Sequence, residues 1–411
     1  METVWSLCFP NFCLLLLPVL VLVLANGVHS HAQVKVFDVR SFSAAADGKT
    51  DDSKAFLDAW NQACQYKGEV QRRLFVPLGT YMVWPVVFKG PCTGPIEFTV
   101  KGVVKAPVDK STFSLDHWIT FQYVSGLLIN GGGTFDGQGQ YAWPENKCAC
   151  KSLPVSLRFN FVNNTAIRSI SSVNSKNFHF NVFKCDNLEF RRIRIIAPDE
   201  SPNTDGIHMG DSSRIRIADS VIATGDDCVS IGPGSKDVEI IGVHCGPGHG
   251  LSVGSLGKYP NEADVTGLSV RGCTMVGTQN GLRIKTWASA LKSNVYNISF
   301  SDITMKDVQS PIIIDQDYCP GGGCSKQIRG TSGSLLAVNL ECSPTFPCQN
   351  INLEDIDLAY TGREGPAKSH CAHGCVGKAS LENEREFLYA VFEFSGMQGR
   401  GTDHRGDGKA Y

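Results

Sequence analysis

Apolar residues recur in the middle of the chain as a short, repeated signature. Each copy places apolar side chains at its first, third, sixth and eighth positions, which describes two period-2 strands separated by a phase slip. The copies are Leu188, Phe190, Ile193 and Ile195; a weaker Ile215, Ile217, Ser220 and Ile222; Val238, Ile240, Val243 and Cys245; Leu268, Val270, Cys273 and Met275; Ile298, Phe300, Ile303 and Met305; and Ile351, Leu353, Ile356 and Leu358. The pattern predicts a chain that bends between strands and keeps its apolar side inward.

The spacing of the copies indicates a solenoid. They begin 27, 23, 30, 30 and 53 residues apart, and repetition at such periods means stacked units that bury their faces on one another. Leucine-rich repeats have similar lengths, but they need a fixed asparagine and a helical leg that this signature lacks. With 42 glycines and no long helical periodicity, the sequence predicts an all-β fold, a single-stranded right-handed parallel β-helix.

One helix is predicted near the start of the repeat region. The stretch DDSKAFLDAWNQAC begins at two candidate N-cap residues, Asp51 and Asp52, and carries an apolar stripe. The stripe consists of Ala55, Phe56, Ala59, Trp60 and Ala63. We expect this amphipathic helix to cover the open N-terminal end of the solenoid, as terminal caps must.

The chain divides into three parts on sequence grounds. The apolar run from Leu14 to Ala25, followed by small residues, predicts a secretory signal peptide over residues 1–30. An uncleaved anchor is the alternative, although Pro10 and Pro18 interrupt a stretch that is short for a membrane span. Residues 31–375 form the predicted β-helix domain. Residues 376–411, with the charge run ENEREF, form an atypical tail that we expect to be poorly ordered.

The net charge and the cysteine content limit the possible partners and the compartment of the protein. Without residues 1–30, which hold one acid (Glu2) and no base, 38 Lys and Arg face 39 Asp and Glu, a net charge of −1. That balance argues against nucleic acid or membrane as a partner of the mature protein. Of 16 cysteines, two lie in the predicted leader, so 14 leave room for seven disulfides in an oxidising compartment.

Cysteine spacing suggests particular bridges, and two sequons fit export. Cys228 and Cys245 lie one strand repeat apart, where a bridge would pin the segment between them. The pairs that could close short loops are Cys319 with Cys324, Cys342 with Cys348, and Cys371 with Cys375. The sequons begin at Asn163 and Asn297. Together these features predict a secreted protein.

The repeat brings scattered acids together. Asp226 and Asp227 lie 11 and 12 residues after Ile215, and His249 lies 11 residues after Val238, so stacking about 4.8 Å per coil places them in one column. Asp205 lies 17 residues after Leu188, and discounting the APDESP excursion returns it to the same phase. Gly225 is expected to bend the chain so that both neighbouring acids reach one groove.

Crowded carboxylates of this kind suit acid–base chemistry. Because they cannot all ionise cheaply, one should have a raised pKa and hold a proton. Hydrolysis of a glycosidic bond needs one acid to protonate the leaving oxygen and one carboxylate to activate water. Arg283 and Lys285, at i and i+2 on a nearby strand, suggest a sugar that is itself anionic.

Four motifs carry a resemblance to a known family. NTDG from Asn203, GDDC from Gly225, GHGLSVGSLG from Gly248 and RIK from Arg283 resemble, in order and spacing, the signatures of the polygalacturonases, glycoside hydrolase family 28. The resemblance runs from about residue 36 to about residue 366. SPNTDGIHMGDS, GLRIKTW and IDQDYCP are more similar to the plant exopolygalacturonase branch than to the endo branch.

The resemblance implies inverting hydrolysis of α-1,4-linked galacturonan in the plant cell wall, without metal or cofactor, by a monomer. It makes Asp226 the general acid, and Asp205 with Asp227 the residues that activate water. His249 would support the acid or contact substrate. The implied substrate-binding residues are Arg283, Lys285, Tyr318 and Asn203.

Two alternatives and one departure remain open from the sequence. A calcium-dependent pectate lyase shares the predicted fold, and a catalytically impaired pectin-binding wall protein would keep the site without turnover. The departure is a missing strand segment of about one structural repeat between the copies at Ile298 and Ile351. It leaves the acid column intact but puts stability in doubt.

Overall fold

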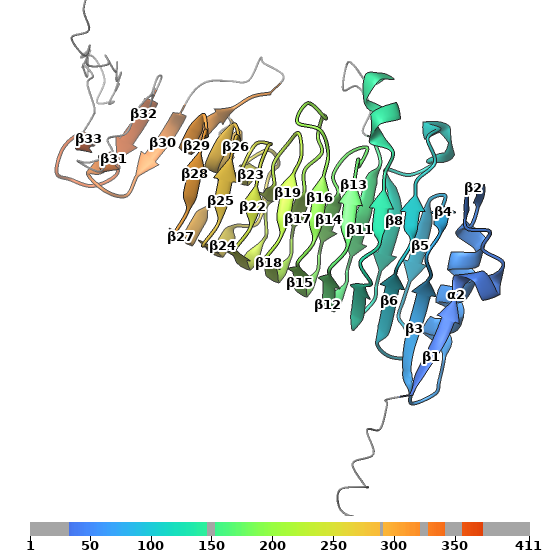
Figure 1. Cartoon of the computed structure of the whole chain (residues 1–411). Helices are drawn as coiled ribbons and strands as arrows, with labels where there is room; N and C mark the ends of the chain where they lie inside the picture. The colour runs from blue at the N-terminus through green and yellow to red at the C-terminus, as the bar shows by residue number, and fades with distance from the viewer. Residues whose placement is uncertain (1–32, 146–152, 288–290, 321–327, 342–355, 373–411) are drawn as a thin grey trace, which may run out of the picture.

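The computed structural model describes residues 33–145, 153–287, 291–320, 328–341 and 356–372. Over most of this length the chain winds into a right-handed parallel β-helix whose coils stack along one axis, with the N-terminal helix at one end (Figure 1). Each coil contributes strands to three parallel sheets, named A, B and C. The fold predicted from the signature is therefore confirmed.

The strands of each sheet follow chain order. Sheet A consists of β1 (Val34–Asp38), β3 (Gln71–Val76), β6 (Ile96–Val100), β9 (Leu127–Asn130), β12 (Asn163–Arg168), β15 (Asp186–Arg191), β18 (Ser213–Ala218), β21 (Lys236–Ile241), β24 (Val265–Arg271) and β27 (Val295–Ser301). Sheet B consists of β2 (Asp47–Asp51), β4 (Thr80–Met82), β7 (Val103–Lys105), β10 (Thr134–Asp136), β13 (Ser171–Val173), β16 (Arg194–Ile196), β19 (Val221–Ala223), β22 (His244–Cys245), β25 (Thr274–Val276) and β28 (Thr304–Lys306). Sheet C consists of β5 (Val86–Lys89), β8 (His117–Gln122), β11 (Val155–Asn160), β14 (Phe180–Phe183), β17 (Ile207–Gly210), β20 (Val229–Ile231), β23 (Leu251–Leu256), β26 (Asn280–Trp287) and β29 (Ser310–Tyr318). Short 3₁₀ helices are η1 (Val39–Phe42), η2 (Lys110–Thr112), η3 (Gly139–Tyr141) and η4 (Trp143–Glu145).

The repeated signature corresponds to a sheet A strand followed by a sheet B strand. The first residues of its copies are register partners, in the order Leu188, Ile215, Val238, Leu268 and Ile298. The phase slip is a turn of two residues, such as Asp219 and Ser220, and the φ of Asp219, 50°, is left-handed. After this turn the apolar side chains again point inward, and they form one continuous core along the solenoid.

The predicted cap is helix α2 (Ser53–Gln65), and its expected apolar stripe is buried. Trp60 is fully buried against Phe88 and Phe121, at ring-centroid distances of 5.1 and 5.8 Å. Asp52 is the N-cap residue, but its side chain makes no capping hydrogen bond. Its carboxylate accepts instead from the backbone N–H groups of residues 45 and 46 and ties the preceding loop to the helix.

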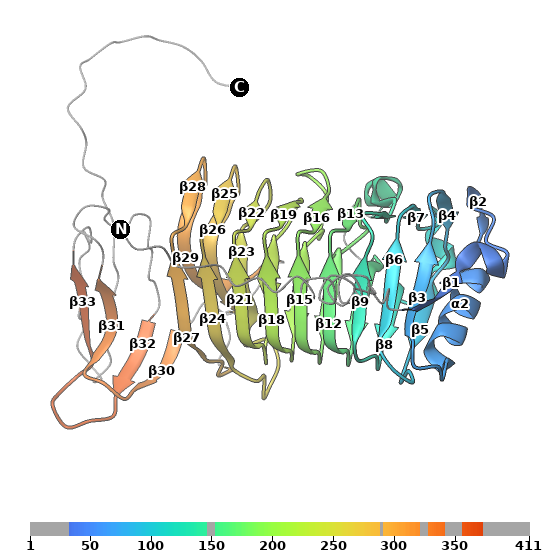
Figure 2. The ribbon, with the colours of Figure 1, turned by 60° about the horizontal axis from the view of Figure 1, so that its bottom comes forward.

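The three sheets end at β27, β28 and β29 (Figure 2). In the described residues after them, β30 (Ile328–Ser332) pairs with β32 (Ile356–Tyr360), and β31 (Leu336–Glu341) pairs with β33 (Lys368–Ala372), as two separate two-stranded sheets. Ile312 and Ile314 occupy inward positions in β29, yet they are 74% and 69% exposed. The break falls where the sequence lacks a copy of the signature to lie on β27.

Two disulfides have both partners among the described residues. Cys228 is bonded to Cys245 as expected, and Cys64 is bonded to Cys92, a pair that the spacing did not suggest. Cys185 and Cys273 are free thiols buried in the core, so the room for seven bridges is not filled. Cys319 is disulfide-bonded, whereas at least one member of each remaining predicted pair lies outside the described residues.

Several other sequence predictions lie outside the described residues. These are the signal peptide, the first residues of the copy at Ile351, and the tail after residue 375. The boundaries of the predicted domain stay a prediction. Among the described residues, no helix has the length and apolar character needed to cross a membrane.

Candidate active site

The catalytic candidates lie just before neighbouring strands of sheet C. Asp205, Asp227 and His249 each stand two residues before the first residues of β17, β20 and β23, which are register partners. The structure therefore aligns Asp227, rather than Asp226, with His249. Counting residues from the sheet A strands aligned Asp226 with His249. The connection from sheet A to sheet C is not the same length in every coil, which shifts the alignment by one residue, to Asp227.

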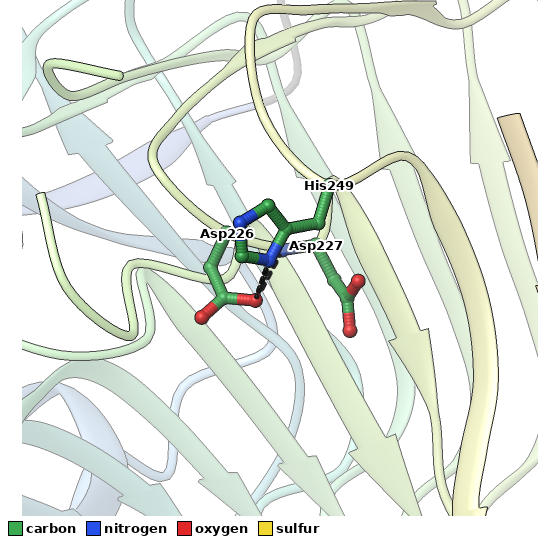
Figure 3. Close-up of side chains that lie close together, drawn as sticks. All are labelled: Asp226, Asp227 and His249. Atoms are coloured by element: carbon green, nitrogen blue, oxygen red, sulfur yellow. Dashed lines mark hydrogen bonds and ion pairs between the residues drawn. The ribbon is translucent and has the colours of Figure 1, made fainter. Parts of the chain in front are cut away.

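Asp226 and His249 form a hydrogen-bonded pair (Figure 3). The Nδ1 atom of His249 lies 3.0 Å from Oδ1 of Asp226. Burial works to raise the pKa of Asp226, but the hydrogen bond and the charge of His249 outweigh it, so that this pKa is lowered. The same hydrogen bond raises the pKa of His249 against the opposing effect of burial. In the free protein the pair therefore holds its proton on the imidazole.

Asp227 is buried, and both of its carboxylate oxygens are held. Ser252 donates to Oδ1 at 2.6 Å, and the Lys285 ammonium donates to Oδ2 at 2.7 Å. Burial raises the pKa of Asp227, and Lys285 offsets only part of that effect. Lys285 in turn has a raised pKa: burial opposes its charge, but Asp227 stabilises it.

Asp205 is the carboxylate with the most strongly perturbed pKa. Burial and the charges of Asp226 and Asp227 raise its pKa well above the usual range, despite a hydrogen bond of 2.6 Å from Ser230. His208 Nδ1 lies 2.7 Å from the same Ser230 hydroxyl. Burial lowers the pKa of His208 to about 4, so a neutral imidazole completes this chain of contacts.

Three of these supporting residues were missed by sequence reasoning. His208, Ser230 and Ser252 are register partners in one row on the outer face of sheet C. Each lies three residues after its own column residue, Asp205, Asp227 or His249. That constant offset is a signal that could have found them.

Gly225 was expected to bend the chain, but the structure requires a glycine here because another segment packs closely against it. The chain bends at residues 225–226, but Gly225 has no left-handed φ. A Cβ at this position would lie 2.2 Å from the carbonyl oxygen of Ser201 and 2.5 Å from that of Asp199. The glycine is required because the APDESP excursion packs directly against it, next to Asp205.

The predicted cations flank the carboxylates. Arg283 follows Ser252 in the outer row of sheet C and pairs with Asp315 at 3.1 Å, while its buried Nε has no hydrogen-bond partner. The guanidinium of Arg283 and the ammonium of Lys285 each lie 5.2 Å from the ring centroid of Tyr318. Asn203 is exposed, and no hydrogen bond among the described residues links it to the acids.

A metal ion has a candidate site here in purely geometric terms. Ligand atoms of Asp226, Asp227 and His249 all lie within 4.8 Å of one another. However, the Lys285 ammonium already contacts Asp227, and the His249 imidazole already contacts Asp226. The protein thus supplies its own cations where a metal would bind, and calcium prefers an all-oxygen ligand set.

Comparisons with known proteins agree with this geometry. Residues 64–379 match the family described as glycosyl hydrolases family 28. An exopolygalacturonase of Platanus acerifolia is 45% identical, covering 85% of this chain and 96% of its own, and a polygalacturonase of Gossypium barbadense is 48% identical, covering 83% and 88%.

Solved structures support the fold alone. An exopolygalacturonase from Thermotoga maritima superposes with a TM-score of 0.61 at 19% identity, covering 88% of this chain and 96% of its own. An endo-xylogalacturonan hydrolase from Aspergillus tubingensis gives 0.65 at 24% identity, covering 81% and 87%. Because the family match spans most of the chain and includes the acid column, the chain belongs to glycosyl hydrolases family 28.

Proposed function

We propose that this protein hydrolyses the α-1,4-galacturonosyl linkages of polygalacturonan and pectin, acting from chain ends. The observation that carries the proposal is the cluster of Asp205, Asp226 and Asp227, whose pKa values are driven apart by their environments. Divergent pKa values among neighbouring carboxylates are the mark of acid and base roles on one bond. The relatives named as exopolygalacturonases support the substrate and the exo action.

Asp226 and His249 act together as the general acid. The proton of the pair rests on His249 in the free protein, because the hydrogen bond raises the pKa of the imidazole and favours an ionised Asp226. A polyanionic substrate adds negative charge beside Asp226 and excludes water, and both effects raise a carboxyl pKa. On binding, Asp226 takes the proton through the 3.0 Å contact and passes it to the leaving oxygen.

Asp227 and Asp205 activate the attacking water. The Ser252 and Lys285 hydrogen bonds leave a lone pair on each Asp227 oxygen free to accept a proton from water. Asp227 takes the proton that the water releases, while Asp205, whose raised pKa favours its protonated form, orients that water through a hydrogen bond. One oxygen of Asp226 and one of Asp227 lie within 4.8 Å of each other, a distance between single atoms and not the separation of carboxyl groups, roughly 6.5–9.5 Å, that is usual for inverting enzymes. The proposal of inversion therefore rests on the family and not on this distance.

Arg283 and Lys285 select a uronate. The unpartnered Nε of Arg283 is a donor that a sugar carboxylate can satisfy, and Arg forms the planar fork that carboxylates fit. Tyr318, against which both cations lie, provides an apolar face for a sugar ring. Asn203 is proposed as a hydrogen-bond donor to the same substrate.

A lyase is the less favoured alternative, because it needs calcium where Lys285 and His249 supply charge. Incubation of the protein with polygalacturonate, with and without chelator, separates the candidates. Hydrolysis yields reducing ends without new ultraviolet absorbance, in monomer units from the first minutes, and proton NMR of the first product gives its anomer. Chelator-sensitive absorbance would indicate a lyase, and binding without products would indicate an impaired wall protein.

The setting we propose is the extracellular cell wall, with the protein secreted as a monomer. The bonded pairs Cys64–Cys92 and Cys228–Cys245 support export, because disulfides persist in oxidising compartments. Secretion is checked by N-terminal sequencing of protein recovered from culture medium, and the monomer by light scattering.

A further inference from the structure

An aromatic row lies at the edge of sheet C, outside the acid column. Tyr123 and Phe161 lie in turns that lead from sheet C to sheet A, and Phe183 is the last residue of β14 before the next such turn; the three side chains, in successive coils, are 46%, 37% and 37% exposed. The rings of Tyr123 and Phe161 are stacked at a centroid distance of 5.1 Å, and Phe161 meets Phe183 edge-on at 6.2 Å. We call these residues, with Lys184, the aromatic row.

The backbone makes these side chains costly. Tyr123, Phe161 and Lys184 have φ values of 57°, 54° and 52°, in the left-handed region where a bulky residue is an outlier and glycine is unstrained. Such conformations cost on the order of 1–3 kcal/mol each. The rings face solvent rather than the core, so core packing does not repay that cost. Left-handed residues recur in other turns of the solenoid, such as Arg192 and Asp219, so this cost belongs to the coil geometry, and the aromatic row is distinguished by the large exposed rings that occupy it.

The positive charge of Lys184 indicates which class of ligand the aromatic row would bind. The Lys184 ammonium lies 5.8 Å from the Phe161 centroid and 5.2 Å from the Phe183 centroid, and the described residues offer it no carboxylate partner. A flat ring face suits the C–H face of a sugar, and the ammonium beside it suits a carboxylate on that sugar. The row therefore matches a uronate chain better than a neutral one.

The aromatic row lies on the same outer face of sheet C as the active site, beyond His208 and about five strand positions from the level of Asp205. Phe183, at the end of β14, pairs with Gly210 of β17, and the outward His208 lies two residues earlier in that strand. Two strand residues span about 6.6 Å and one coil about 4.8 Å, so the two backbones come within about 8 Å. His208 in turn reaches Asp205 through Ser230.

We propose that Tyr123, Phe161, Phe183 and Lys184 form an accessory binding surface for galacturonan beside the catalytic groove. The inference rests on the proposed function for the identity of the polymer. The surface holds uronate units of a long chain, or of a neighbouring chain in the wall, and so favours long substrates over short ones. Exposed apolar patches rimmed by charge commonly mark such contacts.

The test is binding of long polygalacturonate to Asp226→Asn protein, so that turnover does not intervene. Phe161→Gly is expected to weaken this binding about two- to tenfold, the size of one aromatic contact, and Lys184→Gln should do likewise. Hydrolysis of trigalacturonate by Phe161→Gly in the otherwise unchanged protein should stay at the level before substitution. Tyr296→Ala, an exposed ring on sheet A (54%), is the matched control and should change neither value.

A merely structural role predicts a different result. Because Phe161→Gly removes left-handed strain, its unfolding temperature should equal or exceed that of the unchanged protein, so weaker binding would not reflect unfolding. Unchanged affinity for the long polymer in Phe161→Gly would overturn the surface, whether or not the protein hydrolyses that polymer. If Phe161→Gly lowered the affinity for the long polymer but Lys184→Gln did not, the preference of this surface for uronates would be overturned.

Discussion

Replacing Lys285 by methionine should make the stability of the protein strongly pH-dependent. Lys285 is 7% exposed, and its ammonium is 2.7 Å from Oδ2 of Asp227, which is itself 1% exposed. Removing one partner of a buried ion pair costs about 3–5 kcal/mol because an uncompensated charge is left behind. Asp205 and Asp226 are close enough to Asp227 to add repulsion.

The sign of the pH effect follows from Asp227. Burial already raises the folded pKa of Asp227 above its usual value of 3.8. Loss of Lys285 raises this pKa further, and each pKa unit corresponds to about 1.4 kcal/mol. Below pH 3.8 the carboxyl is protonated in both folded and unfolded chains, so Asp227 adds no penalty. As pH rises from 3.8 through the folded pKa, only the unfolded chain ionises freely, and stability is lost.

Denaturant unfolding of Lys285→Met and the unchanged protein at pH 4 and pH 7 measures this directly. We expect the variant to lose about 3–5 kcal/mol at pH 7 and clearly less at pH 4. The double variant Lys285→Met with Asp227→Asn should recover most of the loss at pH 7, because no buried charge remains. An equal loss at both pH values, with no recovery in the double variant, would refute the ion-pair reasoning.

Three further outcomes follow from the site and the core. Asp226→Asn should lower the kcat of polygalacturonate hydrolysis by at least about two orders of magnitude with an unchanged unfolding temperature; near-normal turnover would contradict its role as acid. Because the pKa of His249 is raised above 6.5, His249 keeps the proton of the acid pair at pH 6.5 and loses it as the pH rises past its raised, folded-state pKa. The kcat/KM profile should therefore fall on the alkaline side. In His249→Gln that fall should move to lower pH, whereas an unmoved alkaline limb would remove His249 from the pair. Cys228→Ser opens a loop with a sequence separation of 17 and should lower the free energy of unfolding by about 3 kcal/mol; equilibrium unfolding checks it, and no loss would mean that packing alone holds this loop.

The solenoid and the positions of the candidate site residues could be predicted from the amino-acid sequence alone. The apolar signature is strictly local, and stacking identical strands in parallel register follows from it, because only one register keeps every apolar face inward. Hence the partners from Leu188 to Ile298 and the meeting of Asp205, Asp226, Asp227 and His249 were predictable from spacing.

The positions of protons and of bonded partners could be seen only in the folded chain. The location of the proton on His249 rather than Asp226 depends on burial and on a 3.0 Å contact, and neither has a local sequence signal. The alignment of Asp227 with His249 depends on turn length. The free thiols Cys185 and Cys273 could not be predicted from spacing either, because disulfide pairing depends on which cysteines meet in space. Spacing can place a residue on a coil, but electrostatics and contact between coils set what that residue does.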